Sequence, residues 1–153
     1  MKMKLKPVIF IFVVFFCLWA WIPSAFSNGI KWHSYKDGVT RGKYEQKNVF
    51  LNFYADWCGF CKKMDKETFK DPAVIAFLNE NFISVKVNSE KERKIAREYY
   101  VTGLPVSWFI AKNGEKISSL PGYVSPGALM NILKYIQTDS YKDMTFKDFL
   151  KTM

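Results

Sequence analysis

The stretch NVFLNFYADWCGFC, residues 48–61, joins an apolar run to two cysteines that are separated by two residues. Residues 48–55 are rich in aromatic and β-branched side chains, which predicts a buried β-strand. A helix that begins at Cys58 would place its sulfur at the positive end of the helix dipole, where a thiolate is stabilised. Cys58 and Cys61 are therefore predicted to form a redox-active dithiol.

Two other interpretations of the cysteine pair compete with this one. A structural zinc site needs four Cys or His ligands, and the chain offers only Cys17 and His33 in addition. We interpret Cys17 as a passive residue of an apolar run and His33 as a surface or edge residue. A permanent structural disulfide would close so short a loop that it constrains the unfolded chain little. The strand-to-helix context favours redox chemistry without a metal or an organic cofactor.

The first 27 residues have the pattern of a secretory signal. Three lysines precede an apolar run at residues 8–22, and Ala25 and Ser27 are small residues suited to a signal peptidase. The run is shorter than the ~20 residues that a membrane-spanning helix needs, so we expect cleavage after Ser27. The alternative is an uncleaved anchor formed by residues 7–22. Both predict an exported, for example periplasmic, protein.

The remaining 126 residues are the size of one domain with a normal core. We expect this domain over residues 28–138, followed by a C-terminal helical extension over residues 139–153. The formal net charge of +9 falls to +6 without the three signal lysines, and the other basic residues are dispersed. Because they form no stripe with interleaved aromatics, we expect no nucleic-acid partner. We also expect the protein to be a monomer.

The region after the signal alternates between strand-like and helix-like segments. Strands are expected at residues 30–35, 48–55 and 82–87, and a hairpin at 105–120 that turns at Asn113-Gly114. Helices are expected from Cys58 to about Phe69, after Asp71-Pro72, from a Ser89 cap to Tyr99, and after Ser125-Pro126. Residues 36–47 show no clear pattern. This order predicts an α/β fold with a central sheet covered on both faces.

The C-terminal residues also form a periodic pattern. Phe146, Phe149, Leu150 and Met153 have i, i+3, i+4, i+7 spacing, which predicts an amphipathic helix. We expect this helix to cap the domain, with a docking surface for a partner as the alternative.

Four segments together resemble the thioredoxin superfamily over about residues 30–138. They are residues 54–61, Gly103-Leu104-Pro105, Lys112-Asn113-Gly114 and Pro121-Gly122-Tyr123. Residues 54–58 followed by residues 68–72 most resemble exported thioredoxin-like reductases, in particular the C-terminal periplasmic domain of the thiol:disulfide interchange protein DsbD. The resemblance implies a thioredoxin-like fold with a central mixed sheet, protein disulfides as substrates, and a membrane electron donor of the DsbD type.

The resemblance also implies roles for the residues around the cysteines. Cys58 would be the exposed attacking thiolate, and Cys61 the more buried thiol that resolves the mixed disulfide. Trp57 would pack beside the sulfurs; an ordinary half-buried aromatic is the alternative. Gly59 and Phe60 lie between the cysteines, where Phe60 replaces the proline of many thioredoxins.

Two further positions follow from the same resemblance. Leu104 and Pro105 would form a cis-proline loop that faces the dithiol and pairs with an extended substrate backbone. Thioredoxins usually carry a buried aspartate six residues before the first cysteine, and this chain has Asn52 there. Because an amide cannot take the proton of Cys61, we expect Asp65, four residues further along the same helix face, to accept it. A solvated carboxylate between two lysines is the alternative role of Asp65.

The sequence therefore predicts an exported thiol:disulfide oxidoreductase that reduces protein disulfides. A dithiol oxidase or isomerase is the alternative within the same chemistry. A non-enzymatic module that uses the Pro105 loop to bind peptides is the alternative outside it.

Overall fold

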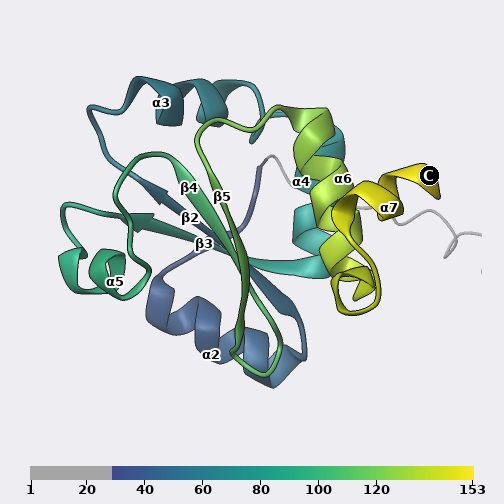
Figure 1. The fold of residues 1–153 in the computed structure, drawn as a ribbon. Helices are drawn as coiled ribbons and strands as arrows, with labels where there is room; N and C mark the ends of the chain where they lie inside the picture. The colour runs from purple at the N-terminus through teal and green to yellow at the C-terminus, as the bar shows by residue number, and fades with distance from the viewer. Residues whose placement is uncertain (1–28) are drawn as a thin grey trace, which may run out of the picture.

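Five strands form a single mixed sheet with the spatial order β1-β3-β2-β4-β5. The computed structural model describes residues 29–153, so the predicted signal or anchor, with Cys17, lies outside the described residues. The parallel strands are β1 (Trp32–His33), β3 (Phe82–Asn88) and β2 (Asn48–Tyr54). β4 (Val106–Ile110) runs antiparallel to β2, and β5 (Lys116–Pro121) antiparallel to β4 (Figure 1). The predicted α/β class and mixed sheet are confirmed.

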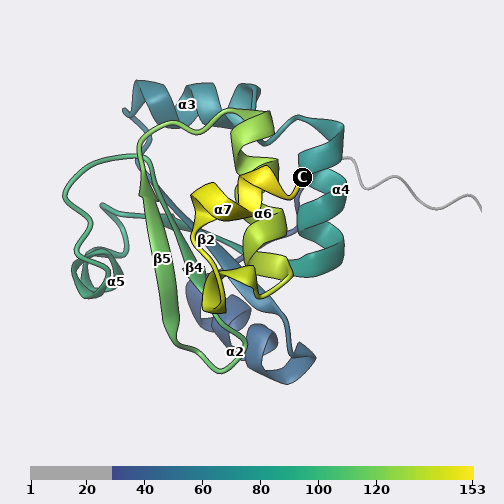
Figure 2. The ribbon, with the colours of Figure 1, turned by 45° about the vertical axis from the view of Figure 1, so that its right-hand side comes forward.

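Helices cover both faces of this sheet (Figures 1 and 2). They are α2 (Tyr35–Glu45) and α5 (Arg93–Glu98) on one face, and α4 (Pro72–Asn81) and α6 (Pro126–Gln137) on the other. Alternate residues of β2 supply the two cores: Phe50 faces α4 and α6, whereas Leu51 and Phe53 belong to the opposite cluster. The short helix α3 (Gly59–Lys66) crosses the end of the sheet.

Helix α2 occupies the segment for which the sequence showed no clear pattern. Ser34 is its N-cap and accepts a hydrogen bond from the Asp37 N–H. Its two glycines lie where the helix approaches the sheet most closely. A Cβ at Gly38 would meet Val85 at 2.1 Å, and one at Gly42 would meet Val49 at 2.5 Å. The glycines, which weaken the helical pattern in the sequence, are what allows α2 to pack against the strands.

The helix boundaries differ in part from the sequence predictions. The Asp71 cap is confirmed, because its Oδ1 accepts hydrogen bonds from the N–H groups of Ala73 and Val74. The predicted Ser89 cap is wrong: α5 begins only at Arg93, and the Asn88 side chain instead binds the N–H groups that follow it. Helix α3 ends at Lys66 rather than near Phe69.

The hairpin and the C-terminus follow the predicted pattern more closely. The β4–β5 turn contains Gly114 with φ of +94°, a value that favours glycine. β5 is an edge strand, and its residues Lys116, Ser118 and Ser119 are exposed.

The C-terminal segment folds back against α6. A 3-10 turn, η2 (Ser140–Lys142), leads to α7 (Phe146–Lys151), which lies against α6 (Figure 2). The rings of Phe146 and Phe149 each lie 5.3 Å from that of Tyr135 on α6. The helix therefore caps α6 with its two phenylalanines, whereas Leu150 and Met153 remain exposed. Within residues 29–153, no helix combines the length and apolarity that crossing a membrane requires.

Candidate active site

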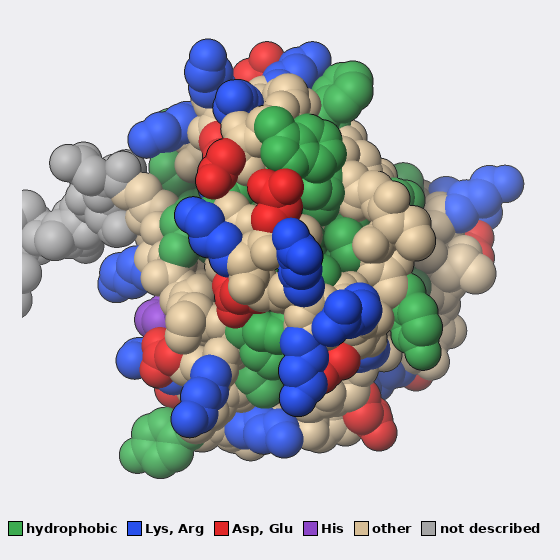
Figure 3. Space-filling model, turned by 90° about the vertical axis from the view of Figure 1, so that its left-hand side faces the viewer, with side chains coloured by type: hydrophobic (Ala, Val, Ile, Leu, Met, Phe, Trp, Pro, Cys, Tyr) green, Lys and Arg blue, Asp and Glu red, His purple; other side chains and the backbone are tan. Residues whose placement is uncertain are grey.

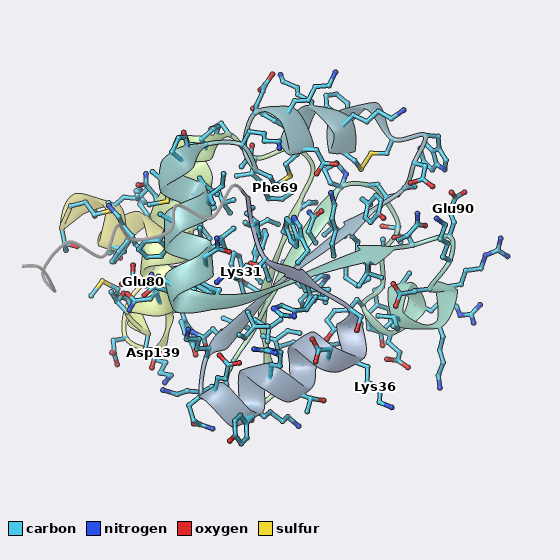
Figure 4. All side chains as sticks on the ribbon, turned by 180° about the vertical axis from the view of Figure 1, so that it is seen from behind. Lys31, Lys36, Phe69, Glu80, Glu90 and Asp139 are labelled. Atoms are coloured by element: carbon cyan, nitrogen blue, oxygen red, sulfur yellow. A yellow bond between two sulfur atoms is a disulfide. The ribbon has the colours of Figure 1, made fainter. Side chains whose placement is uncertain are left out.

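The two predicted cysteines are joined in a disulfide at the start of α3 (Figure 4). Cys58 is the N-cap residue of the helix, and its Sγ accepts a hydrogen bond from the Cys61 N–H at 3.1 Å. Cys61 lies one turn further along, with a Cα–Cα distance of 5.2 Å between the two residues. A thiolate on Cys58 would occupy the positive end of the helix dipole. The arrangement suits reversible opening and closing of the disulfide.

Both cysteines are buried in this oxidised form. The expected difference in exposure is not observed, because Cys58 is 4% and Cys61 3% exposed. The reason is local packing: Ala55, Tyr54 and Leu104 surround the two sulfurs. A substrate sulfur that reaches Cys58 must therefore pass these neighbouring side chains.

The loop before β4 forms one wall of the site. The Leu104–Pro105 peptide bond is cis, as the resemblance implied. Leu104 packs against the cysteine cluster, and the Pro105 carbonyl accepts a hydrogen bond from the Gly122 N–H at 2.7 Å. The loop thus connects the dithiol to the end of β5, and it holds Leu104 against the sulfurs.

The residues that directly precede the two cysteines in the sequence are aromatic and exposed. Trp57 is 67% exposed and Phe60 64% exposed, so Trp57 is not the half-buried aromatic of the alternative, and its packing beside the sulfurs stays a prediction. At Gly59 a Cβ would meet nothing within 4 Å. Figure 3 shows the face that carries α5 and one end of α3, with hydrophobic side chains gathered near the α3 end among charged ones. This end of the molecule offers a partner an apolar surface.

Asp65 forms an ion pair that the sequence did not predict. Its Oδ1 lies 2.5 Å from Nζ of Lys86 on β3, and the two side chains are 40% and 20% exposed. The same ammonium lies over the ring of Tyr54, at 4.8 Å, and within 5.8 Å of the Trp32 and Phe69 rings. Asp65 is therefore held toward the sheet by Lys86, rather than lying free between its lysine neighbours on α3.

Lys86 is also linked to the position where thioredoxins carry the buried aspartate. It stands opposite Asn52 in the register of β2 and β3. Asn52 is 2% exposed, and its Nδ2 donates a hydrogen bond to the Ser107 Oγ at 3.1 Å. The amide is thus satisfied within the sheet, and the acidic group nearest in sequence to Cys61 is Asp65 on the helix.

Sequence reasoning missed the contacts that Lys86 makes with Asp65 and Tyr54, although Lys86 carries a signal. Lys86 is the one charged residue in the apolar run FISVKV at residues 82–87. A lysine at such a position needs a partner, because an isolated buried charge is costly. Among residues 29–153, no group of three His, Cys, Asp or Glu side chains could hold a metal ion.

Comparison with known proteins identifies the family to which the sequence is similar. Residues 37–137 match the thioredoxin-like domain family. Thiol:disulfide interchange protein DsbD of Photorhabdus laumondii is 34% identical over 89 residues, which are 56% of this chain and 15% of that protein. Such curated relatives are much longer than this chain, which matches only about one-seventh of their length.

Solved structures agree on the fold. A thioredoxin from Thermus thermophilus superposes with a TM-score of 0.65 at 23% identity, covering 71% of this chain and 87% of that one. A putative disulphide isomerase from Bacteroides thetaiotaomicron superposes with a TM-score of 0.60 at 26% identity, covering 76% and 98%. The matched family spans well over half of the residues, including the cysteine pair and the cis-proline loop. The chain therefore belongs to the thioredoxin-like domain family.

Proposed function

We propose that this chain is an exported thiol:disulfide oxidoreductase that reduces disulfide bonds in other proteins. The observation that carries the proposal is the Cys58–Cys61 disulfide at the start of α3, packed against Leu104 of the cis-proline loop. The relatives named as thiol:disulfide interchange proteins support this chemistry.

The proposed reaction uses the sulfur of Cys58 first and the sulfur of Cys61 second. In the reduced protein, the Cys58 thiolate attacks one sulfur of a substrate disulfide and forms a mixed disulfide, and the other substrate sulfur leaves as a thiolate. Cys61 then loses its proton and attacks the Cys58 sulfur. This second step releases the substrate as a dithiol and leaves the Cys58–Cys61 disulfide. Two electrons have passed from the protein to the substrate.

Asp65 is the group that we assign to the second step. It lies four residues after Cys61 on α3, and Lys86 fixes its carboxylate on the side of the helix that faces the sheet. A positioned carboxylate can take a proton from a thiol that must become nucleophilic. Asn52, at the usual acidic position, cannot do so.

The direction of electron flow is part of the proposal. An exported reductant must be reduced again outside the cytosol, so we propose a membrane donor of the DsbD type as its partner. The signal-like residues 2–27 support export. No metal or organic cofactor takes part in the proposed cycle.

The reduction potential tests the direction. Equilibration of the protein with glutathione buffers, read by intact mass after thiol alkylation, gives the potential of the Cys58–Cys61 pair. A value near that of thioredoxin, about −270 mV, supports a reductant, whereas one near −120 mV would indicate an oxidant of the DsbA type.

Trapping tests the chemistry and reveals the substrates. Cys61→Ser keeps the attacking sulfur and removes the resolving one, so it should accumulate mixed disulfides with substrate proteins in the exporting cell. Cys58→Ser is the matched control and should trap few. If neither variant forms mixed disulfides and the disulfide resists mild reduction, the protein is a peptide-binding module rather than an enzyme.

A further inference from the structure

A hollow adjoins the cis-proline loop. Its volume is about 520 Å³, and its walls come from residues 99–106, from Trp108 on β4 and from the end of β5. Leu104 belongs both to this wall and to the group packed against the disulfide. The hollow therefore adjoins, through Leu104, the group of residues packed around Cys58. Its size lies within the range of pockets that hold small ligands or single bulky side chains.

The floor of the hollow consists of aromatic residues that are fixed by contacts with their neighbours. The rings of Tyr99 and Trp108 meet edge to face, with centroids 5.5 Å apart. Tyr99 is buried against Phe53, and its hydroxyl lies 3.1 Å from that of Tyr35. Lys116 stacks over the Tyr99 ring, with Nζ 4.0 Å from the centroid. The residues that line the hollow are uncharged, and the Nζ of Lys116 also lies 5.7 Å from the centroid of the Trp108 ring.

Tyr100 on the wall of the hollow is unusual in its backbone. Its φ is +51°. Its N–H donates to the Arg97 carbonyl, and the Val101 N–H donates to the Ala96 carbonyl, each at 3.0 Å. These two bonds form the C-terminal cap of α5 in which a left-handed residue, most often glycine, stands at the position of Tyr100.

The tyrosine ring contributes little to this cap. Tyr100 is 84% exposed, so its ring adds little to a packed core, and glycine would adopt the same backbone at lower cost. Strained residues that the fold does not need for packing cluster at sites of function. Tyrosine is also among the residues that contribute most to binding at interfaces. A ligand in the hollow would give the ring a role.

The loop itself can accept a polypeptide. Backbone N–H and C=O groups of residues 102–104 make no hydrogen bond to another residue of the described chain. An extended segment can pair with them, and its alternate side chains then point to the same side. A chain that presents its cysteine to Cys58 along this loop would deliver a neighbouring side chain to the aromatic hollow.

We propose that the hollow is a subsite for the substrate segment that flanks the attacked cysteine. It takes a bulky, uncharged, apolar or aromatic side chain, against which Tyr100 stacks. This inference rests on the proposed function and adds to it a preference among protein disulfides. Tyr100 is thus a specificity-determining residue.

The test compares reduction of symmetric peptide disulfides by the reduced protein. Each peptide carries one cysteine with phenylalanine, serine or glutamate at one of the four positions within two residues of it. Bis(2-hydroxyethyl) disulfide, which has no peptide, reports the dithiol chemistry alone. We expect the phenylalanine peptide with the best position to be reduced fastest and the glutamate peptides slowest.

The variants separate recognition from folding. Tyr100→Gly keeps the cap of α5 and removes the ring, so the preference for phenylalanine over serine should fall about three- to tenfold, the range of an aromatic pair. Tyr100→Phe should keep the preference. Tyr44→Ala, at a tyrosine of α2 that is 89% exposed, should keep it too.

Two results would overturn the inference. In the first, Tyr100→Gly leaves the ratio of the rates with the phenylalanine and serine peptides unchanged, or slows the reduction of every disulfide equally. If the unaltered protein still reduces bis(2-hydroxyethyl) disulfide, only the subsite is then wrong. In the second, the unaltered protein reduces none of the disulfides, and the proposed function fails together with the subsite.

Discussion

The two sulfurs of the disulfide differ in their relation to α3. Cys58 caps the helix and its Sγ accepts a backbone hydrogen bond, whereas Cys61 lies within the first turn and donates that bond through its N–H. The free N–H groups at a helix start and the dipole behind them stabilise negative charge at the cap. When the bond is reduced, the charge should therefore reside on Cys58.

Alkylation of the reduced protein tests this difference. We expect iodoacetamide to modify Cys58 first, with a half-maximal rate below the pH of about 8.5 at which a free cysteine is half ionised. The rate is followed by mass spectrometry of peptides from samples quenched at a series of pH values. Preferential modification of Cys61, or a midpoint at or above that of the free thiol, would contradict the assignment of the nucleophile.

Substitution of Asp65 tests the proposed proton acceptor. Asp65→Asn should slow the attack of Cys61 on the mixed disulfide by about 10²-fold, the lower range for a positioned acid or base. The first step, by Cys58, should change much less, so the mixed disulfide accumulates in an acid-quench experiment. Lys86→Gln removes the ion-pair partner but leaves the carboxylate, and it should slow the second step less than Asp65→Asn. Parent rates in both steps for Asp65→Asn would show that the carboxylate takes no part.

At the scale of elements, α2 shows how packing overrides a weak local pattern. Glycine in a helix interior costs about 1 kcal/mol relative to alanine, and α2 contains two. Both face the sheet, at Val85 and Val49, where a side chain would collide. The helix forms because its close approach buries apolar surface that a larger residue would hold away from the strands.

Alanine substitutions test this account of α2. Gly38→Ala and Gly42→Ala should each destabilise the oxidised protein by about 1–3 kcal/mol, because overpacking outweighs the gain in helix propensity. Gly127→Ala on α6 is the control: apart from its chain neighbours and the backbone of its own helix, nothing lies within 4 Å of the added Cβ, so the change should be neutral or stabilising by up to about 1 kcal/mol. Urea unfolding measures all three. Stabilisation by Gly38→Ala would contradict the packing argument.

The predictable parts of the molecule are those encoded by neighbours in the sequence. The Cys58–Cys61 pair, the Asp71 cap and the Asn113-Gly114 turn act within a few residues, so the sequence was enough to predict them. The partner of Asp65 was not predictable, because Lys86 reaches it from β3 through the order of the strands. The burial of Cys58 likewise depends on Leu104, which comes from a loop more than forty residues away.

At the scale of the whole molecule, the disulfide lies at one end of a sheet with a core on each face. β2 contributes to both cores and leads directly into the cysteine motif. The reactive group therefore follows a central, largely buried strand, while the residues around it belong to loops at the end of that strand. Such a division lets the site open and close without disturbing either core.

Export of the chain is tested by the N-terminus of the protein recovered from the cell. We expect the protein recovered from the producing cell to begin at Asn28, because Ala25 and Ser27 suit a signal peptidase. Intact-mass measurement of the protein from the cell envelope decides this. A chain that retains residues 1–27 and partitions with membranes would establish the anchor instead.

The two borders of the sheet bear on how the protein behaves among unfolded chains. An open strand at the border of a sheet invites other chains to add to it and so begins aggregation. One border here is β1, only two residues long, and the other is β5, whose exposed positions include a lysine and two serines. The proposed function would bring the protein into repeated contact with extended polypeptides. With one border short and the other carrying exposed polar side chains, we expect such polypeptides to find little opportunity to add a strand to this sheet.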